Sequence, residues 1–413
     1  MADELILCYR IHTPANPIGA WLSEAIDRIR LITSDDTHDA YAPDFPNLES
    51  VPDYVTSPEV ERRMDAICER GGTKAIIHVT EDDILRCARV RDRYGIPGLG
   101  LADALPWRDK YHMKQWMREA GVPTADFLVP TDARDAQEFA ERVGYPLVAK
   151  PRLGFASRGV ELLSGPDEVK RAAADWDFDD LLLESYVEGG TMYHVDGFTD
   201  SAGVTYAQVS RYVNGCLSFA EALPLGSVQL DPGSPESAEL TAYTERVVAA
   251  LPDVGFCPFH LEVFRTPDGE LVFCEIACRL GGAHVVETLT LATGVNPLRL
   301  WVRHQAGLED GRQTVLADRG RRYGWLFVPP KAGRLLSIRE PGETAYIRQY
   351  SIRTTTPRTF DGAHSSSDCI ATFVVDGADS AEVERNLRAC VDLMGSLATW
   401  EDEREQAAAG SPG

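Results

Sequence analysis

The sequence predicts a mixed protein of the α/β class with α+β parts, and three observations lead to that class. Strand and helix signals alternate up to about Leu105, which is typical of a small α/β domain. Frequent strands separated by glycines follow over residues 123–307. Within them, two apolar runs flank Thr-Pro-Asp-Gly at 266–269, which is a turn signal, so residues 256–283 are expected to form a β-hairpin.

The N-terminal segment is expected to alternate between strands and helices. A first strand covers Glu4–Tyr9, and a broken loop leads to a helix over Trp21–Arg30. A polar, proline-rich stretch occupies residues 33–58. The apolar run Ala75–Thr80 predicts a buried strand, followed by a helix that ends near Tyr94. No G-x-G-x-x-G follows the first strand, so nothing supports a dinucleotide site.

Three elements can be placed in the remainder of the chain. A helix is expected over Asp109–Ala120, because Gly121-Val-Pro123 stops it. Further on, Gly324–Val328 predicts a strand and Ser380–Met394 a helix. The residues after Glu401 are small and polar, and we expect them to be disordered.

Composition excludes several classes of partner. The net charge is −23, from 41 Lys and Arg against 64 Asp and Glu, whereas a nucleic-acid backbone requires clustered positive charge, so no nucleic-acid partner is expected. No basic and apolar leader is visible, and no run approaches about 18 apolar residues, so neither secretion nor a membrane span is expected. Nine cysteines without a C-x-x-C pair predict reduced thiols in the cytoplasm.

The predicted hairpin carries acidic residues on one face. Alternation puts His260, Glu262 and Phe264 together on the first strand and Glu275 on the second. Counting from the turn places Glu262 opposite or diagonal to Glu275, with side-chain bases roughly 5–8 Å apart. Two carboxylates at that spacing suit Mg²⁺ or Mn²⁺ that also carries substrate phosphates. The alternative is a pair on a solvated face of the sheet that neighbouring arginines neutralise.

Two further segments have features of a nucleotide site. A strand ends at Lys150 and continues into a loop with glycines and a serine at 154–159, whose N–H groups could surround an anion. The alternative is a hairpin turn with a lysine at the surface. A second apolar strand ends at Glu184, and the backbone just after it, at 186–187, could hydrogen-bond the edge of a flat heterocycle.

Taken in order, these motifs resemble those of the ATP-grasp ligases. The resemblance covers about residues 75–335, and its five runs are W-R-D-K-Y-H-M-K-Q-W-M-R-E-A-G-V-P around Lys110, P-L-V-A-K-P around Lys150, L-L-E-S-Y-V-E-G around Glu184, H-L-E around Glu262 and E-I-A-C-R-L-G-G around Glu275. Within that superfamily the chain is most similar to carboxylate–amine ligases that join amino acids, the L-amino-acid ligases of the bacilysin-synthetase type.

The resemblance implies an ATP-grasp fold in which two lobes enclose the nucleotide. It divides the chain into an N-terminal pre-ATP-grasp α/β domain at 1–105, a small lobe with the phosphate loop at 106–190, a large lobe with a C-terminal subdomain at 191–400 and a disordered tail at 401–413.

The resemblance also implies roles for single residues. They are Lys110 and Lys150 for the α- and β-phosphates, Ser157 in the mobile loop above them, Glu184, Tyr186 and Val187 in the hinge that receives adenine, Glu262 and Glu275 as metal ligands, and Arg279 for the acyl phosphate. A guanidinium is suited to the developing negative charge at that last position.

The chain departs from the family's pattern at three positions. Ala277 stands where many members carry Asn, although the amino-acid-ligase subgroup also has Ala there. Met192 stands where an acidic residue often holds the ribose, which leaves Glu188 as a substitute. Ala283, directly after Gly282, stands where an alanine-preferring relative has a bulky residue, so we expect a wider acceptor pocket.

Two histidines face the expected site. His260 lies two residues from Glu262 on the same face and is a candidate for supporting that metal ligand. His194 is better explained as a structural histidine with its hydrogen bonds satisfied.

Glu81 is a candidate for amine recognition. It follows a predicted strand at its carboxyl end, where open α/β sheets bind ligands, and it aligns with an acidic residue that contacts substrate in the amino-acid-ligase relative. A carboxylate there would hold an ammonium group by a charge-assisted hydrogen bond. The alternative is a residue in the first turn of a helix that Thr80 caps.

The activity that the resemblance implies is formation of an amide, or peptide-like, bond. ATP phosphorylates a carboxylate, an amine attacks the acyl phosphate, and ADP and phosphate leave. ATP and Mg²⁺, with Mn²⁺ as a substitute, are the expected cofactors, and amino acids or similar metabolites of natural-product biosynthesis are the expected substrates. Three alternatives stay open: transfer to a carrier-protein thiol, transfer to a non-peptide amine, and a degenerate nucleotide-binding regulator. A homodimer is also left open.

Overall fold

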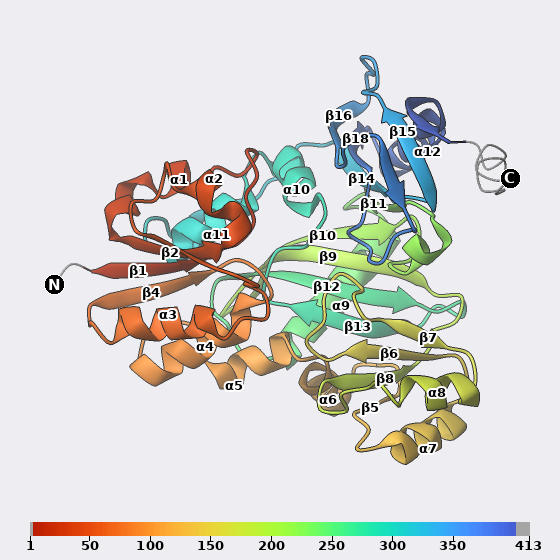
Figure 1. Ribbon diagram of the computed structural model, residues 1–413, viewed down its shortest axis with the longest axis horizontal. Helices are drawn as coiled ribbons and strands as arrows, with labels where there is room; N and C mark the ends of the chain where they lie inside the picture. The colour runs from red at the N-terminus through yellow and green to blue at the C-terminus, as the bar shows by residue number, and fades with distance from the viewer. Residues whose placement is uncertain (1–2, 402–413) are drawn as a thin grey trace, which may run out of the picture.

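The computed structural model describes residues 3–401 (Figure 1). The disordered tail predicted at the C-terminus lies outside these residues, apart from Glu401. Within the described chain the strands form an N-terminal parallel sheet, a small antiparallel sheet, a large eight-stranded sheet and a three-stranded sheet. The predicted mixed α/β class is confirmed.

The N-terminal sheet has the strand order β3-β2-β1-β4, and all of its neighbours are parallel. Its strands are β1 (Glu4–Cys8), β2 (Ile29–Ser34), β3 (Leu48–Val51) and β4 (Thr73–His78). Alternate residues of β1 enter two different cores. Leu5 and Leu7 belong to the core that includes α11 (Pro297–Gln305), whereas Ile6 and Cys8 pack with α3 (Glu59–Cys68). Helices therefore cover both faces, as is usual for parallel sheets (Figure 1).

One helix predicted in this region is wrong. The residues of Trp21–Arg30 form the end of α1 (Ile18–Trp21), a 3-10 turn at Ser23–Arg28 and the start of β2. β2 is hydrogen-bonded on both edges and is almost fully buried, so its apolar residues follow no helical period. The polar, proline-rich stretch at 33–58 contains β3 and α2 (His38–Tyr41).

A helical connection leads from this sheet to the next lobe. It contains α4 (Asp83–Tyr94), α5 (Leu101–Ala104), a 3-10 turn (Leu105–Trp107) and α6 (Lys110–Glu119). The carboxylate of Asp109 caps α6 by accepting a hydrogen bond of 2.9 Å from the Tyr111 N–H. Both helices predicted here, the one ending at Tyr94 and the one starting near Asp109, are confirmed.

The small lobe is an antiparallel sheet of order β5-β8-β6-β7. Its elements are β5 (Phe127–Leu128), α7 (Ala133–Val143), β6 (Leu147–Pro151), β7 (Glu161–Leu163), α8 (Pro166–Ala172) and β8 (Leu181–Ser185). Two predicted features, the strand that ends beside Lys150 and the strand that contains Glu184, are neighbours in this sheet.

The large sheet has the order β13-β12-β9-β10-β11-β14-β18-β16. Its strands are β9 (Thr191–Asp200), β10 (Gly203–Tyr212), β11 (Leu225–Gln229), β12 (Cys257–Arg265), β13 (Leu271–Ala277), β14 (Arg322–Val328), β16 (Ile347–Ile352) and β18 (Ala371–Gly377). The predicted hairpin is β12 and β13, and Glu262 lies directly opposite Glu275 in its register.

The two faces of this sheet differ in chemistry. On β12, Phe259, Leu261 and Val263 enter the apolar core together with α9 (Pro235–Ala250). His260 and Glu262 alternate with them and face the opposite side. Farther along the sheet, α12 (Ser380–Leu397) packs with β18 and β14. Helices thus fill one face, while the polar residues of the other face remain available for a site.

The remaining elements complete the upper part of Figure 1. They are α10 (Val285–Thr293), β15 (Gly333–Ile338), β17 (Arg358–Phe360) and β19 (Ala398–Trp400), the last three forming the sheet β17-β15-β19. Among residues 3–401 no helix is long and apolar enough to cross a membrane. The division into four segments that we expect from the sequence stays a prediction.

Candidate active site

A cavity of about 510 Å³ lies between the small lobe and the large sheet. Its wall brings together residues that are far apart in the sequence and that the motifs had singled out. These wall residues are Lys110, Lys150, Ser157, Glu184, Tyr186, Val187, Glu262 and Glu275. The phosphate loop, the strand end at Glu184 and the hairpin therefore surround one space.

The two hairpin carboxylates enter this cavity from adjacent strands. The Tyr212 hydroxyl donates a hydrogen bond of 2.8 Å to Glu262 Oε1, and His260 Nε2 lies 3.5 Å from the same oxygen. Burial acts to raise the pKa of Glu262, but the contacts with His260 and Tyr212 outweigh it and leave the pKa below its usual value. Lys110 Nζ lies 3.3 Å from Glu275 Oε2.

These contacts bear on the two explanations for the carboxylate pair. The nearby positive groups are Lys110 and His260, not arginines at a solvated face, and Glu262 is buried. Two carboxylates that face a cavity beside a lysine form an oxygen-only donor set, which suits Mg²⁺ in the presence of phosphates. The residues present therefore fit such an ion.

A buried cluster of two lysines and one glutamate forms another part of the wall. Glu184 Oε1 lies 2.9 Å from Lys150 Nζ and 3.3 Å from Lys114 Nζ. Burial acts to lower the pKa of Lys150, but the Glu184 carboxylate outweighs it and raises the pKa above its usual value. Lys150 is thus a buried cation, and the alternative of a surface lysine is wrong.

Lys114 is a wall residue that sequence reasoning missed. Its side chain is fully buried, with Nζ 3.5 Å from the Phe273 carbonyl oxygen. A signal was present, because Lys114 follows Lys110 by four residues in a predicted helix and so shares its face. Arg211 and Asn214 also line the cavity, and no pattern in their surroundings indicated it.

The loop after β6 is held close to the start of α6. The Lys110 N–H donates to the Arg152 carbonyl oxygen at 3.3 Å, and Lys110 Nζ donates to that of Gly154 at 2.6 Å. Ala156 and Ser157 have φ of 54° and 56°, in the left-handed region that side chains with Cβ rarely adopt. Such a turn points successive N–H groups to one side, which is the arrangement that binds anions.

The residues expected to contact adenine line the cavity, whereas the residue expected to contact the ribose does not. Tyr186 and Val187 follow β8 and line the cavity, where the predicted hinge should be. Met192 also lines it, in place of the expected acid. Glu188 is exposed and lies outside the cavity wall, so the geometry gives no support to its proposed contact with the ribose.

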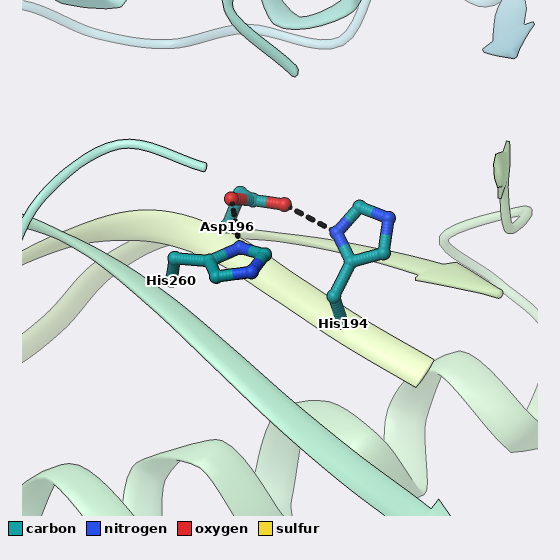
Figure 2. A group of neighbouring side chains, drawn as sticks. All are labelled: His194, Asp196 and His260. Carbon is teal, nitrogen blue, oxygen red and sulfur yellow. Dashed lines mark hydrogen bonds and ion pairs between the residues drawn. The ribbon is translucent and has the colours of Figure 1, made fainter. Parts of the chain in front are cut away.

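Behind Glu262 lies a buried network centred on Asp196 (Figure 2). The two carboxylate oxygens of Asp196 contact His194 Nδ1 at 2.5 Å and His260 Nδ1 at 2.8 Å. His194 Nε2 contacts the Ser227 hydroxyl at 2.6 Å. Both ring nitrogens of His194 and Nδ1 of His260 make short hydrogen bonds, and His260 Nε2 lies 3.5 Å from Glu262 Oε1, so we interpret the group as a hydrogen-bond network rather than as a metal centre. The structural assignment of His194 is confirmed.

This network raises the pKa of His260, and the loop that follows β13 packs directly against it. Burial acts to lower the pKa of His260, but Asp196 outweighs it and raises the pKa to about 9. A Cβ on Gly281 would lie 2.4 Å from Asp196 Oδ1 and 2.9 Å from His260 Nδ1. Only glycine thus lets the loop that carries Arg279 lie directly against the network.

Arg279 is held by Glu81 of the N-terminal domain. Its Nε and Nη2 donate to Glu81 Oε2 at 2.9 and 2.6 Å, and Nη1 donates to the Leu280 carbonyl oxygen. Burial acts to raise the pKa of Glu81, but Arg279 and then Arg108 outweigh it and lower the pKa to about 2. α4 begins at Asp83, so Glu81 precedes the helix and does not lie in its first turn.

A second cavity, of about 280 Å³, is lined by Glu81 and other residues of the N-terminal domain, with Arg108 and Leu153. Its wall contains Glu61, Glu81, Asp82, Arg86, Arg89 and Arg108 together with the apolar Val55, Leu85 and Leu153. Within residues 3–401, three buried polar atoms of this wall make no hydrogen bond: the acceptor Asp82 Oδ1 and the donors Arg86 Nη2 and Arg108 Nη1, although each donor lies beside a carboxylate. A cavity with a free acceptor and with guanidinium donors in its wall is suited to a small zwitterion.

Parts of the sequence are similar to those of known proteins. A model of the ATP-grasp domain matches residues 115–286. An L-arginine-specific L-amino acid ligase from Bacillus subtilis is 28% identical over 266 residues, which cover 60% of this chain and 62% of that protein. An N5-carboxyaminoimidazole ribonucleotide synthase from Pseudomonas aeruginosa is 29% identical over 231 residues, which cover 54% and 60%. The chain thus spans less than two thirds of the length of either relative.

Solved structures extend the likeness to nearly the whole chain. The L-amino acid ligase from Bacillus licheniformis has a TM-score of 0.74 at 15% identity, covering 97% of this chain and 99% of that one. The biotin carboxylase domain of the Hydrogenobacter thermophilus 2-oxoglutarate carboxylase, a dimer in complex with MgADP, ADP and bicarbonate, has a TM-score of 0.65 at 20% identity, covering 96% and 90%. At these identities the likeness shows the fold.

Proposed function

Because the chain has the ATP-grasp fold and contains an ATP-grasp domain over residues 115–286, we propose that it is an ATP-dependent carboxylate–amine ligase. The observation that carries the proposal is the convergence of Glu262 and Glu275 with Lys110 and Lys150 on one cavity. Paired carboxylates and two lysines provide the charges that a nucleotide triphosphate and its metal ion require.

The proposed reaction has two steps. A substrate carboxylate oxygen attacks the γ-phosphorus of ATP, the bond to the β,γ-bridging oxygen breaks, and ADP and an acyl phosphate result. The amine nitrogen of a second substrate then attacks the acyl carbon, phosphate leaves, and the amine loses a proton as the amide forms. Mg²⁺, or Mn²⁺ in its place, would be held by Glu262 and Glu275 and neutralise phosphate charge when bound.

Each protein group has a task in this scheme. Lys110 and Lys150 bind the α- and β-phosphates, and the loop around Ser157 covers them. Tyr186 and Val187 present backbone groups to the adenine edge, while Glu184 keeps Lys150 in place through the ion pair described above. Arg279 binds the acyl phosphate and the oxyanion that develops in the second step. His260 holds Glu262 from behind.

We further propose that the substrates are amino acids or close analogues. Two of the similar proteins described above are amino acid ligases. Glu81 offers a carboxylate for an ammonium group, and the second cavity beside it has walls of both signs. Gly282 and Ala283 follow Arg279 and are exposed, so no large side chain closes the acceptor side there. All nine cysteines are free thiols, which is consistent with the predicted cytoplasmic location.

The test is release of ADP and phosphate by the whole protein with MgATP and a panel of amino acids, singly and in pairs. We expect release that depends on a pair, and mass spectrometry of the products should show the sum of the two masses less one water. If ADP and phosphate are released with one amino acid only when an amine or a carrier protein is added, the acceptor is that amine or carrier protein and not a second amino acid. Nucleotide binding without release under any pair would overturn the ligase proposal.

A further inference from the structure

Arg108 joins three parts of the molecule that the proposed reaction must align. It lies just before α6, two residues from Lys110, and only 5% of its surface is exposed. Its Nε donates to the Glu81 carbonyl oxygen at 3.0 Å, and its Nη1 lies 3.4 Å from Glu81 Oε1. Its Nη2 donates to the carbonyl oxygen of Leu153 in the phosphate loop.

The contact with Leu153 is one of several hydrogen bonds that attach the phosphate loop to the start of α6. Three consecutive carbonyl oxygens, those of Arg152, Leu153 and Gly154, are bound by donors from Arg108 and Lys110. A displacement of this loop therefore breaks hydrogen bonds at the start of α6. Because a guanidinium is planar and its donors are fixed in one fork, Arg108 cannot follow Leu153 without changing its contacts with Glu81.

The contact with Glu81 extends the connection to Arg279. One oxygen of the Glu81 carboxylate receives Arg279, and the other lies near Arg108. Glu81 and both arginines are mostly buried, and losing a buried charged partner is costly. Loop, Arg108, Glu81 and Arg279 thus form one continuous chain of polar contacts.

We propose that Arg108 is a positioning residue that couples the phosphate loop to Arg279, so that closure of the loop over ATP sets the arginine for the acyl-phosphate step. This inference rests on the proposed function. Arg108 itself lies outside the wall of the 510 Å³ cavity proposed to bind ATP, the nucleotide cavity, and lines the second cavity, where its Nη1 lies 3.4 Å from Glu81 Oε1. A substrate bound in the second cavity would contact the Arg108 guanidinium, which also donates to the Leu153 carbonyl oxygen of the phosphate loop.

The chain offers a matched control in Arg152. Its guanidinium donates to Asp109 at 2.7 and 3.3 Å and to the Asp179 carbonyl oxygen, so it attaches the same loop to the same helix. Within the described part of the chain it contacts neither Glu81 nor Arg279, and it does not line the nucleotide cavity. Arg152→Met therefore weakens the loop's attachment without interrupting the proposed connection.

The experiment follows hydrogen exchange in the full-length protein with and without the non-hydrolysable analogue AMP-PNP and Mg²⁺. In the wild type we expect AMP-PNP to slow exchange both in residues 152–160 and in residues 279–283. In Arg108→Met the slowing at 279–283 should fall at least about tenfold, while the analogue still binds. Arg152→Met should retain the response at 279–283. Arg108→Lys keeps the charge but not the fork, and should lose the response while folding normally.

Each outcome decides a different point. If the wild type fails to bind AMP-PNP, the proposed function itself is overturned. If the analogue binds but residues 279–283 respond equally in wild type and both Arg108 variants, or not at all, the coupling role is overturned. If turnover is obtained with a substrate pair, Arg108→Lys should lower kcat about tenfold and leave the KM for ATP within about twofold, because its effect falls on the later step. A change in thermal stability alone would reduce Arg108 to a structural residue.

Discussion

The two cavities of this protein are built in different ways. The nucleotide cavity takes its charged groups from short motifs within one continuous part of the chain, and ion pairs such as Lys150–Glu184 join neighbouring strands of one sheet. The second cavity joins the N-terminal domain to Arg108 and the phosphate loop, and its wall residue Glu81 pairs with Arg279, which lies 198 residues away and outside the wall. The first arrangement is suited to an invariant ligand such as ATP, whereas the second allows substrate recognition to vary with the N-terminal domain.

The largest effect is expected from the proposed metal ligands of the nucleotide cavity, Glu262 and Glu275. Glu262→Gln and Glu275→Gln each keep the size of the side chain but remove a negative charge, and we expect turnover to fall about 10³-fold or more. Glu270→Gln, an exposed position in the same hairpin, serves as the control. Steady-state ADP release at varied Mg²⁺ measures the effect, and wild-type-like turnover in either variant would contradict the metal assignment.

Arg279 lines neither cavity wall but pairs with Glu81 of the second cavity, and we propose that it acts after nucleotide binding, so its loss should separate chemistry from nucleotide binding. Arg279→Ala is expected to lower kcat about 100-fold and to change the KM for ATP little, because the arginine acts at the acyl-phosphate stage. It also leaves Glu81 without its main partner, so a loss of stability of about 3 kcal/mol should accompany it. Kinetics together with chemical denaturation test both points, and weaker ATP binding as the sole effect would show the role to be wrong.

Glu81 belongs to the second cavity, so its replacement should affect the amino acid and not the nucleotide. Glu81→Gln is expected to raise the KM for an amino-acid substrate about tenfold, through loss of a charge-assisted hydrogen bond, with the KM for ATP unchanged. Glu61→Gln, which alters the wall of the same cavity but pairs with Arg89 and Arg93, is the control. Unaltered substrate kinetics with only a small loss of thermal stability would leave Glu81 a purely structural role.

The last prediction concerns the network behind Glu262, and its effect appears as a pH dependence of stability and not as a change in turnover. The pKa of His260 is raised to about 9, so its contribution is fully present below the usual value of 6.5 and is lost as the pH rises through about 9. Over that window the contribution to the free energy of unfolding should decline by about 3 kcal/mol. Urea denaturation of wild type and His260→Gln should show a stability difference that narrows toward pH 9. A difference independent of pH would mean that His260 is not charged.

Much of the nucleotide cavity could be predicted because its signals are local. Period-2 alternation around one turn placed Glu262 opposite or diagonal to Glu275, and the register shows that the two lie directly opposite. The strands that end at Lys150 and Glu184 could be placed by their apolar runs, and the helix that carries Lys110 by its Gly121-Val-Pro123 stop. Lys114 could have been found by the same helical spacing that places it on the face of Lys110.

Tertiary structure alone decided the rest. The segment predicted as a helix at Trp21–Arg30 contains the start of a strand because neighbours on both sides supply its hydrogen bonds, which local propensity does not report. Whether Glu81 serves a helix end or an arginine depended on where a loop 198 residues away lies. Pairings within one hairpin or helix follow from the geometry of the backbone. Pairings between distant segments follow from packing, and for that reason the partners of Arg108, Glu81 and Arg279 became visible only in the folded chain.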